Sequence, residues 1–395
     1  MVVSNNMAGD GVVDRPLTVL HVSLWLLGSG GGGIQTYLAT VFRALEVRGV
    51  RNRFAALMPG SVPEYCEPDA VRLGQAGMPK WRLAWQLTQY LSGAVNNVDI
   101  VHVHGALGWP ALCAWLVCRR HRVPYVISPH GTLYPWFQAR LSWRLRLYSR
   151  LFGAAVLHSA SAIVVNKPAE AVVAGQAVSA GKIRIVRPGL RQKITEGRGG
   201  QVRPDSSFAR RAVFVSRVEP LKGLEVLVRA LEILRSHGLY WRVDVIGADV
   251  QGHTMRIRQM SRQLGVEKQV SLHGYLSECE KFSLISEANV FVMPSHAEAF
   301  SFATAEAIAS GLPVVVSSEV ALSDVVREYQ CGIVFPAGDP AALADALREF
   351  EDDCFWTKCR YQALACATAE FPLSLMGERL ESVYRQTIEE FQGIA

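Results

Sequence analysis

The feature that most constrains the fold is an alternation of short apolar runs with segments of helical length, which occurs twice along the chain. In the first series the predicted helix is Ile34–Val47, and the predicted strands are Leu17–Ser23, Asp99–His104, Tyr125–Ser128, Ala162–Asn166 and Ile183–Val186. After residue 210 the predicted strands are Ala212–Ser216, Arg242–Ile246, Val270–His273, Val290–Pro294 and Pro313–Ser317. Uninterrupted apolar strands that alternate with helices are typical of parallel sheets covered on both faces.

The length of the chain, 395 residues, exceeds what one hydrophobic core usually supports. Between the two series, Glu196–Arg211 is rich in Gly, Arg, Ser and Pro, a composition typical of a linker. We therefore predict an α/β chain with two doubly wound, Rossmann-like domains that face each other across a cleft. Their predicted bounds are 16–195 and 211–371, with a linker at 196–210. An amphipathic helix is expected over 372–395, and residues 1–15 are expected to be disordered.

Composition limits the classes of partner and the compartment. Half of the residues are hydrophobic and 19% are charged, as in globular proteins. The net charge of +6 is too small to indicate a nucleic-acid partner. The eight cysteines include no Cys-x-x-Cys pair, which favours a reducing compartment. No secretory leader is visible, and the longest apolar stretch, Gly105–Cys118, is too short to span a bilayer. We expect a cytoplasmic protein, soluble or peripheral on the inner face of the membrane.

Two glutamates stand near the end of one predicted strand. Ligands of doubly wound sheets bind outside the carboxyl ends of the strands, so Glu298, which follows the strand ending at Pro294, is a candidate catalytic residue. Glu306 lies on the next helix among Ala, Ile and Phe neighbours. A carboxylate in such surroundings needs hydrogen-bond donors, and a sugar diol offers two. The alternative is a surface helix with two incidental glutamates.

Cations follow the first strand of the second series. Arg217 and Lys222 lie in the loop and helix start after Ser216, and Gly223 follows them. Such cations at a strand end can clamp a diphosphate, and their place at a helix start indicates a bound anion that compensates the dipole. Free backbone N–H groups at the start of another helix suit the same anion, at Phe300, Ser301 and Phe302.

A glycine-rich segment, Gly28–Gly33, follows the first predicted strand. Glycines at 28, 30 and 33 satisfy the dinucleotide fingerprint, but the strand near Phe54–Leu57 has no acidic residue at its end, which disfavours NAD. We predict instead that this backbone approaches a ligand closely or forms a mobile lid, at Gly31, Gly32 and Gly33. A flexible turn without ligand contact is the alternative.

Histidines mark the ends of two strands in the first series. His130 follows the strand Tyr125–Ser128 and is expected to face the cleft, where it could hold a sugar hydroxyl or the acceptor; a structural histidine is the alternative. His102 and His104 lie on one face of a strand, but no third metal ligand stands out, so structural roles are favoured. The chain contains no Asp-x-Asp motif. We therefore expect no metal and no other cofactor, with the anion's charge neutralised by Arg217 and Lys222.

One basic and aromatic segment could contact a membrane. Over residues 135–152 a predicted helix interleaves aromatic and apolar residues with four arginines, Arg140, Arg144, Arg146 and Arg150. Such a helix can lie among anionic lipid headgroups. The alternative is a helix that packs on the core and exposes an arginine face to solvent.

Together, these motifs resemble the family 4 retaining glycosyltransferases, which have the GT-B fold. The resemblance extends from the glycine loop to about residue 345 and includes the Glu-x7-Glu spacing of Glu298 and Glu306. It implies that Arg217 and Lys222 bind the donor diphosphate, and that Glu306 binds the ribose. It further implies that Glu298 holds the donor sugar and that His130 lies beside the transferred sugar. Two segments depart from the family pattern, Arg187–Leu190 and Ala299–Ser301.

By this resemblance the chain would transfer a sugar from a nucleotide diphosphate sugar to a glycan or lipid-linked acceptor, with retention, in bacterial cell-surface or exopolysaccharide synthesis. The C-terminal helix would cross back to the first domain. The diphosphate would leave with its charge stabilised by cations, without a protein nucleophile. Three alternatives remain open: an epimerase or phosphorylase of the same fold, a nucleotide-sugar-binding protein without turnover, and an NAD-dependent reductase.

Overall fold

The computed structural model describes residues 15–23, 33–56, 70–72, 78–190 and 210–394. Its first sheet has seven strands, all parallel, in the order β3-β2-β1-β4-β5-β6-β7. From that edge to the other the strands are β3 (Ala70–Arg72), β2 (Arg51–Ala56), β1 (Thr18–Ser23), β4 (Ile100–His104), β5 (Tyr125–Ser128), β6 (Ala162–Val165) and β7 (Ile183–Ile185). The order reverses between β1 and β4, so this sheet is doubly wound.

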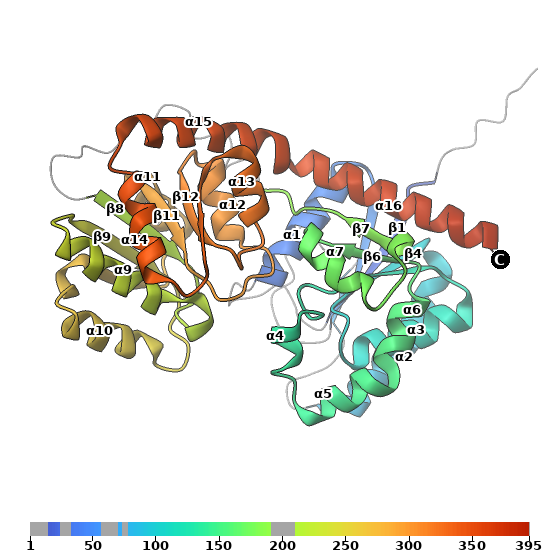
Figure 1. Cartoon of the computed structure of the whole chain (residues 1–395). Helices are drawn as coiled ribbons and strands as arrows, with labels where there is room; N and C mark the ends of the chain where they lie inside the picture. The colour runs from blue at the N-terminus through green and yellow to red at the C-terminus, as the bar shows by residue number, and fades with distance from the viewer. Residues whose placement is uncertain (1–14, 24–32, 57–69, 73–77, 191–209, 395) are drawn as a thin grey trace, which may run out of the picture.

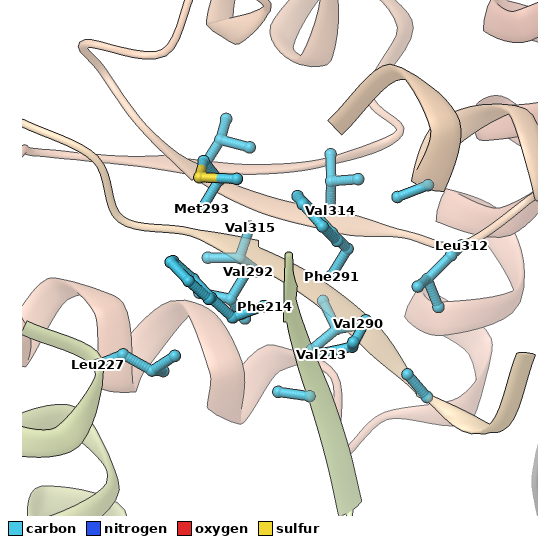
Figure 2. Close-up of a cluster of buried hydrophobic side chains, with 14 of the residues drawn as sticks. Val213, Phe214, Leu227, Val290, Phe291, Val292, Met293, Leu312, Val314 and Val315 are labelled. Atoms are coloured by element: carbon cyan, nitrogen blue, oxygen red, sulfur yellow. The ribbon is translucent and has the colours of Figure 1, made fainter. Parts of the chain in front are cut away.

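The second sheet has six parallel strands in the order β10-β9-β8-β11-β12-β13. In that order they are β10 (Val270–Gly274), β9 (Trp241–Ile246), β8 (Arg210–Val215), β11 (Val290–Met293), β12 (Val314–Ser317) and β13 (Gly332–Phe335). The order reverses between β8 and β11. Figure 2 shows a cluster of hydrophobic side chains in this half, among them Phe214, Phe291 and Val292 of the central strands, all fully buried.

Helices cover both sheets (Figure 1). Those of the first series are α1 (Gly33–Glu46), α2 (Lys80–Ala94), α3 (Trp109–His121), α4 (Pro135–Gln138), α5 (Trp143–Tyr148), α6 (Ala154–Ser159) and α7 (Pro168–Gly175). Those of the second series are α9 (Leu224–Ser236), α10 (His253–Gln263), α11 (Glu278–Glu287), α12 (Phe302–Ala309), α13 (Ser323–Tyr329), α14 (Pro340–Glu349) and α15 (Asp353–Glu370). Short 3₁₀ or π turns connect some of them, including η3 (Ser149–Gly153) and η5 (Pro220–Lys222).

The continuous apolar character of the strands is explained by burial on both faces. Alternate residues of β4 belong to different cores: Val101 packs with α2 and α3, whereas Ile100 packs with α1 and the last helix. The predicted doubly wound α/β class is therefore confirmed. Two edge strands were not predicted. One is β3, with three residues, and the other is β13, whose apolar run of three residues follows a glycine.

The last helix, α16 (Leu373–Ile394), packs along the first sheet (Figure 1). Met376, Leu380 and Tyr384 are buried in the same core as β1 and α1. A Cβ at Gly377 would lie 2.4 Å from the carbonyl oxygen of Ala44, so only glycine permits this approach of α16 to α1. Over the described part of the chain, no helix combines the length and the apolar character needed to cross a bilayer.

The segment 135–152 is not the single helix that its composition predicts. It forms α4, a turn, α5 and the π-helical turn η3. The break lies where Leu141 turns inward and is buried while Ser142 adopts an extended backbone, so burial of one apolar side chain overrides helix propensity. The alternative of a core-packing helix is also wrong for most of its apolar residues, because Trp143, Leu147 and Leu151 are exposed by 70%, 49% and 61%.

Candidate functional site

The candidate residues gather at the carboxyl ends of the strands where the order of each sheet reverses. In the second sheet, Arg217 and Lys222 follow β8, and Glu298 follows β11, the strand next to it. In the first sheet, His104 ends β4 and His130 follows β5. Doubly wound sheets bind their ligands at these reversal points. The sequence-based choice of segments thus agrees with the topology.

Lys222 and Glu298 form an ion pair. Lys222 Nζ lies 2.5 Å from Glu298 Oε2, and the side chains are only 9% and 16% exposed. Gly223 has a left-handed backbone, with φ of 67°, and a Cβ there would lie 2.1 Å from the carbonyl oxygen of Pro294, so glycine is required for the two loops to meet. The sequence argument that a bound anion must compensate Lys222 is therefore corrected, since Glu298 already does so.

Arg217 is the more accessible cation. Its guanidinium pairs with Glu219 at 2.8 Å and is 57% exposed. Water screens the exposed guanidinium, but the carboxylate of Glu219 is only 16% exposed. Arg217 can therefore turn toward another anion more readily than Lys222, whose side chain is only 9% exposed and pairs with Glu298.

The start of α12 offers backbone donors. Ser301 caps the helix, and its side-chain oxygen accepts from Thr304 N while its backbone is left-handed, with φ of 73°. Among the described residues, none accepts a hydrogen bond from the backbone N–H groups of Phe300, Ser301 or Phe302. The phenyl ring of Phe300, however, is buried in the hydrophobic core of the second sheet, so only the backbone of this residue could touch a ligand. The arrangement suits an anion.

Glu306 has a partner that the sequence did not reveal. Lys281 Nζ of α11 donates to Glu306 Oε2 at 2.8 Å, and both side chains are largely buried, 16% and 13% exposed. The premise that a sugar diol must satisfy this carboxylate is thus corrected. Lys281 is 25 residues away along the chain, and nothing in its own surroundings indicates the contact.

The turn after β5 is held by a buried carboxylate. His130 and Gly131 both have left-handed backbones, with φ of 51° and 79°. Glu170, fully buried, accepts from Gly131 N at 2.7 Å and from Asn166 N at 3.1 Å. Burial raises the pKa of Glu170, while the two backbone donors and Lys167 oppose that shift. Two hydrogen bonds to one buried group therefore maintain a conformation that is unfavourable for His130.

This turn contacts the second half of the site. A Cβ at Gly131 would lie 3.0 Å from Cβ of Ala299, the residue after Glu298. Lys167, nine-tenths buried after β6, lies with Nζ 5.2 Å from the ring centre of Tyr134. Burial lowers the pKa of Lys167, and Glu170, Asp324, Glu319 and Glu298 oppose that shift, so carboxylates of both halves lie near it. The structure therefore brings His130 and Glu298 into one region.

Behind the turn lies a cluster of histidines, His21, His102, His104 and His130. His21 supplies the third nitrogen that the sequence did not reveal: one ligand atom each from His21, His102 and His104 all lie within 4.8 Å of one another. Burial lowers the pKa values of His21 and His130 to about 4, and those of His102 and His104 well below the usual range. All four rings are thus neutral near pH 7.

Other predicted residues remain apart from these contacts. Gly33 is the first residue of α1 and is exposed, and Gly31 and Gly32 lie outside the described residues, as does the linker up to residue 209. The disorder expected for residues 1–15 also falls almost wholly outside them. Sequence reasoning missed Glu170, Lys167, Lys281 and His21. Of these only Glu170 carries a signal, as an acidic residue in the first turn of a helix after a strand.

Two family models match the chain in tandem. The model described as glycosyltransferase family 4 matches residues 31–191, and the model described as glycosyl transferases group 1 matches residues 207–363. The boundary between the matches falls between the two sheets, and the first match begins after β1.

Curated relatives match along nearly the whole chain. A D-inositol 3-phosphate glycosyltransferase 1 of Catenulispora acidiphila is 28% identical over 400 residues, covering 93% of each protein. A GDP-mannose:cellobiosyl-diphosphopolyprenol alpha-mannosyltransferase of Komagataeibacter xylinus is 25% identical over 360 residues, covering 86% of this chain and 84% of the relative. Among solved structures, Anabaena Alr3699/HepE in complex with UDP superimposes with a TM-score of 0.77 at 17% identity, covering 94% and 100% of the two chains.

Proposed function

The chain belongs to the family 4 glycosyltransferases and has the GT-B fold, and from this premise we propose that it transfers a sugar from a nucleotide diphosphate sugar, with retention, to a glycan or lipid-linked acceptor. The observation that carries the donor assignment is the buried pair of Lys222 and Glu298 beside the unpaired N–H groups that start α12. A cation and a helix start at one reversal point are what a diphosphate requires.

In the proposed donor complex the diphosphate lies at the second sheet. Arg217 leaves Glu219, and Lys222 turns from Glu298 toward the β-phosphate. Both cations then stabilise the charge that develops on the leaving diphosphate. Because both cations change partner when the donor binds, little further reorganisation is needed at the moment of reaction. Charge neutralisation by protein cations is the reason that no metal is expected.

Release of Lys222 frees Glu298 for the sugar. A largely buried carboxylate that has lost its ion-pair partner needs other hydrogen-bond donors. Two vicinal sugar hydroxyls can supply them. In the same complex Glu306 binds the ribose while Lys281 keeps its charge compensated. The glycine backbone, Gly31 to Gly33, approaches the phosphates from the first domain.

In the proposed complex His130 of the first domain contacts the transferred sugar. As a neutral ring it can hold a hydroxyl of the transferred sugar without bringing a positive charge beside the oxocarbenium-like centre. The left-handed turn that Glu170 maintains lies against Ala299, the residue after Glu298. The acceptor then attacks from the face that the diphosphate leaves, so the configuration is retained.

The acceptor class is proposed as lipid-linked, on the inner face of a bacterial membrane, for cell-surface or exopolysaccharide synthesis. The name of the relative from Komagataeibacter xylinus includes a diphosphopolyprenol acceptor. Exposed apolar side chains at Trp143, Leu147 and Leu151 supply a surface that can enter a headgroup layer. Arginines exposed between them supply attraction to anionic lipid, at Arg140, Arg144, Arg146 and Arg150.

Turnover of a panel of UDP-, GDP- and ADP-sugars tests the enzymatic proposal. Thermal shift identifies the donors that bind, since a ligand of the native state raises its melting temperature. Hydrolysis or transfer of those donors is expected to collapse in Glu298→Ala and in Lys222→Ala while the circular dichroism spectrum persists. Lys268→Ala, an exposed lysine of the same half, is the control. Full activity in both site variants would contradict the assignment.

The same assays separate the alternatives. Appearance of an epimerised sugar, or cleavage that depends on inorganic phosphate, would indicate an epimerase or phosphorylase. Tight donor binding with no turnover of any acceptor would indicate a binding protein. Nicotinamide binding would indicate a reductase, and we expect none.

Flotation with liposomes tests the membrane surface. Vesicles with anionic lipid are expected to retain the protein, and neutral vesicles to retain much less. Replacement of Arg144 and Arg146 by Gln should reduce retention, whereas the same change at Arg256 and Arg258, exposed on α10, should not. Equal retention of both double variants would show that the segment is an ordinary surface.

A further inference from the structure

The described structure contains a chain of hydrogen bonds that crosses three adjacent strands and ends at His130. It runs from Asn52 of β2 through His21 of β1 and His104 of β4. His21 Nε2 lies 3.1 Å from Asn52 Oδ1, His21 Nδ1 lies 3.0 Å from His104 Nε2, and His104 Nδ1 lies 3.3 Å from His130 Nε2. In such a chain every hydrogen bond is donated in the same direction, and the group at the end with a fixed orientation determines that direction.

The anchored end is the amide of Asn52. Its Nδ2 donates to the carbonyl oxygens of Phe42 and Val50, at 3.4 and 3.5 Å, so Oδ1 is the atom that faces His21. An amide oxygen only accepts, and therefore His21 carries its proton on Nε2. A neutral imidazole has one donor and one acceptor, so His21 Nδ1 must accept from His104 Nε2.

The same reasoning transmits the direction to His130. With its proton on Nε2, His104 presents Nδ1 as an acceptor, and the proton shared with His130 must lie on His130 Nε2. The opposite tautomer of His130 would place two lone pairs against each other. Burial of the rings lowers their pKa values, so none is charged near neutral pH. Each ring therefore keeps one donor and one acceptor nitrogen. His130 Nδ1 is then unprotonated, and no described residue donates to it.

We propose that Asn52, His21 and His104 are positioning residues that fix His130 in the Nε2–H tautomer and so keep its Nδ1 as an acceptor for a hydroxyl of the substrate. The identity of that hydroxyl rests on the proposed function. A histidine without this chain would divide between two tautomers, and the Nδ1–H form would repel a hydroxyl that needs to donate.

A metal ion in the cluster is disfavoured by the same contacts. His102 Nδ1 lies 2.6 Å from the hydroxyl of Tyr384, and His102 Nε2 lies 2.8 Å from that of Ser128. Every ring nitrogen of His21, His102 and His104 thus already has a hydrogen-bond partner. A metal would have to break these bonds in a buried region, whereas the tautomer chain uses them as they are.

The test is nitrogen NMR on the whole protein labelled with ¹⁵N-histidine, at neutral pH and without donor. His130 is assigned by its loss in His130→Gln. We expect a protonated Nε2 and an unprotonated Nδ1 in the wild type. His104→Phe removes the acceptor and should let both tautomers appear, with kcat lowered about tenfold and KM changed much less. His104→Asn, whose side-chain oxygen can replace Nδ1, should restore the single tautomer and most of the rate.

The outcomes separate this inference from the proposed function. A wild-type His130 protonated on Nδ1, or His104→Phe with an unchanged tautomer and rate, would overturn the inference. So would added Zn²⁺ at micromolar concentration that shifts the ring signals of His21, His102 and His104 together. If His104→Phe does not fold, Asn52→Leu breaks the anchor instead and should give the same mixture. The wild-type spectrum decides the tautomer even if no donor is turned over.

Discussion

In the first sheet the side chains beside the candidate site are histidines bonded to one another, whereas in the second sheet they are pairs of opposite charge. His104 lies between His21 and His130 and contacts both. The pairs Lys222–Glu298 and Lys281–Glu306 form the charged half. One half therefore presents neutral hydrogen-bonding groups and the other presents charges that can be exchanged.

This difference follows from burial. The histidine cluster lies on the face of the first sheet that α1 and α16 cover, where an ionised ring would lose its hydration without a counter-charge. In the second half Lys222 and Lys281 each have a carboxylate within 2.8 Å, so their charges are stabilised even at low exposure. A sugar with no net charge suits the first arrangement, and a diphosphate suits the second.

The largest predicted effect comes from breaking the ion pair of Lys222 with Glu298 in the charged half. Lys222→Met removes the cation and leaves Glu298 unpaired, so both the melting temperature and the activity should fall. We expect kcat/KM to fall by about 10²–10³-fold, as for the loss of one preorganised group that stabilises transition-state charge.

The double variant Lys222→Met/Glu298→Gln separates stability from function. It removes the unpaired carboxylate and should recover most of the melting temperature, but none of the activity. Recovery of activity together with stability would show that the pair is structural. Lys268→Met serves as the exposed control.

The next predicted effect is a loss of folding stability at acid pH, which tests the contrast between the neutral half and the charged half. The pKa of His21 is lowered from 6.5 to about 4 by burial, so the unfolded chain takes up the proton more readily than the folded one. Stability from this group is complete above pH 6.5 and is lost as pH falls toward 4, by about 3 kcal/mol. His130 shifts in the same direction.

Thermal unfolding between pH 7.5 and 5 measures this loss. His21→Gln should be less stable at pH 7.5 but show a weaker dependence on pH, whereas His237→Gln, exposed in the second half, should follow the wild type. A melting temperature that is flat from pH 7.5 to 5 would mean that the cluster is hydrated or already charged.

A smaller effect is expected at the carboxylate that supports the turn. Glu170→Gln keeps the size of the side chain but places an amide NH₂ against one of two backbone donors, Gly131 N or Asn166 N. Loss of that bond in a buried site should cost about 1–3 kcal/mol of stability. If the turn positions His130, kcat should fall as well, and donor binding should not. Unchanged kcat in a destabilised variant would limit Glu170 to a structural role.

The smallest effect distinguishes the two residues of the second ion pair. Glu306→Ala should raise the donor KM about tenfold, as expected when a ribose loses a charged acceptor. Lys281→Ala should raise it less, because the carboxylate that touches the ribose remains. Equal changes in both would indicate that the pair acts only through the packing of α11 on α12. Free nucleoside diphosphate is the ligand for a direct titration of both variants.

The fold could be predicted from the sequence because the central strands are short, mostly apolar runs separated by segments of helical length. Residues such as Glu298, Lys222 and His130 could be found because they directly follow such runs. Their partners could not, since contacts such as Lys281 with Glu306, or Asn52 with His21, depend on which elements the topology makes adjacent. The break in the helix expected over 135–152 could not be predicted either, because it depends on the burial of one residue, Leu141.

Hydrogen exchange with and without a nucleoside diphosphate tests the central claim most directly, namely that the charged half receives the donor. With saturating UDP, GDP or ADP, whichever binds, we predict slower amide exchange in peptides covering 216–224 and 298–306, and unchanged exchange in α10, which lies away from β8 and β11. Protection confined to the histidine side of the first sheet, at 100–104 and 128–132, would contradict the account.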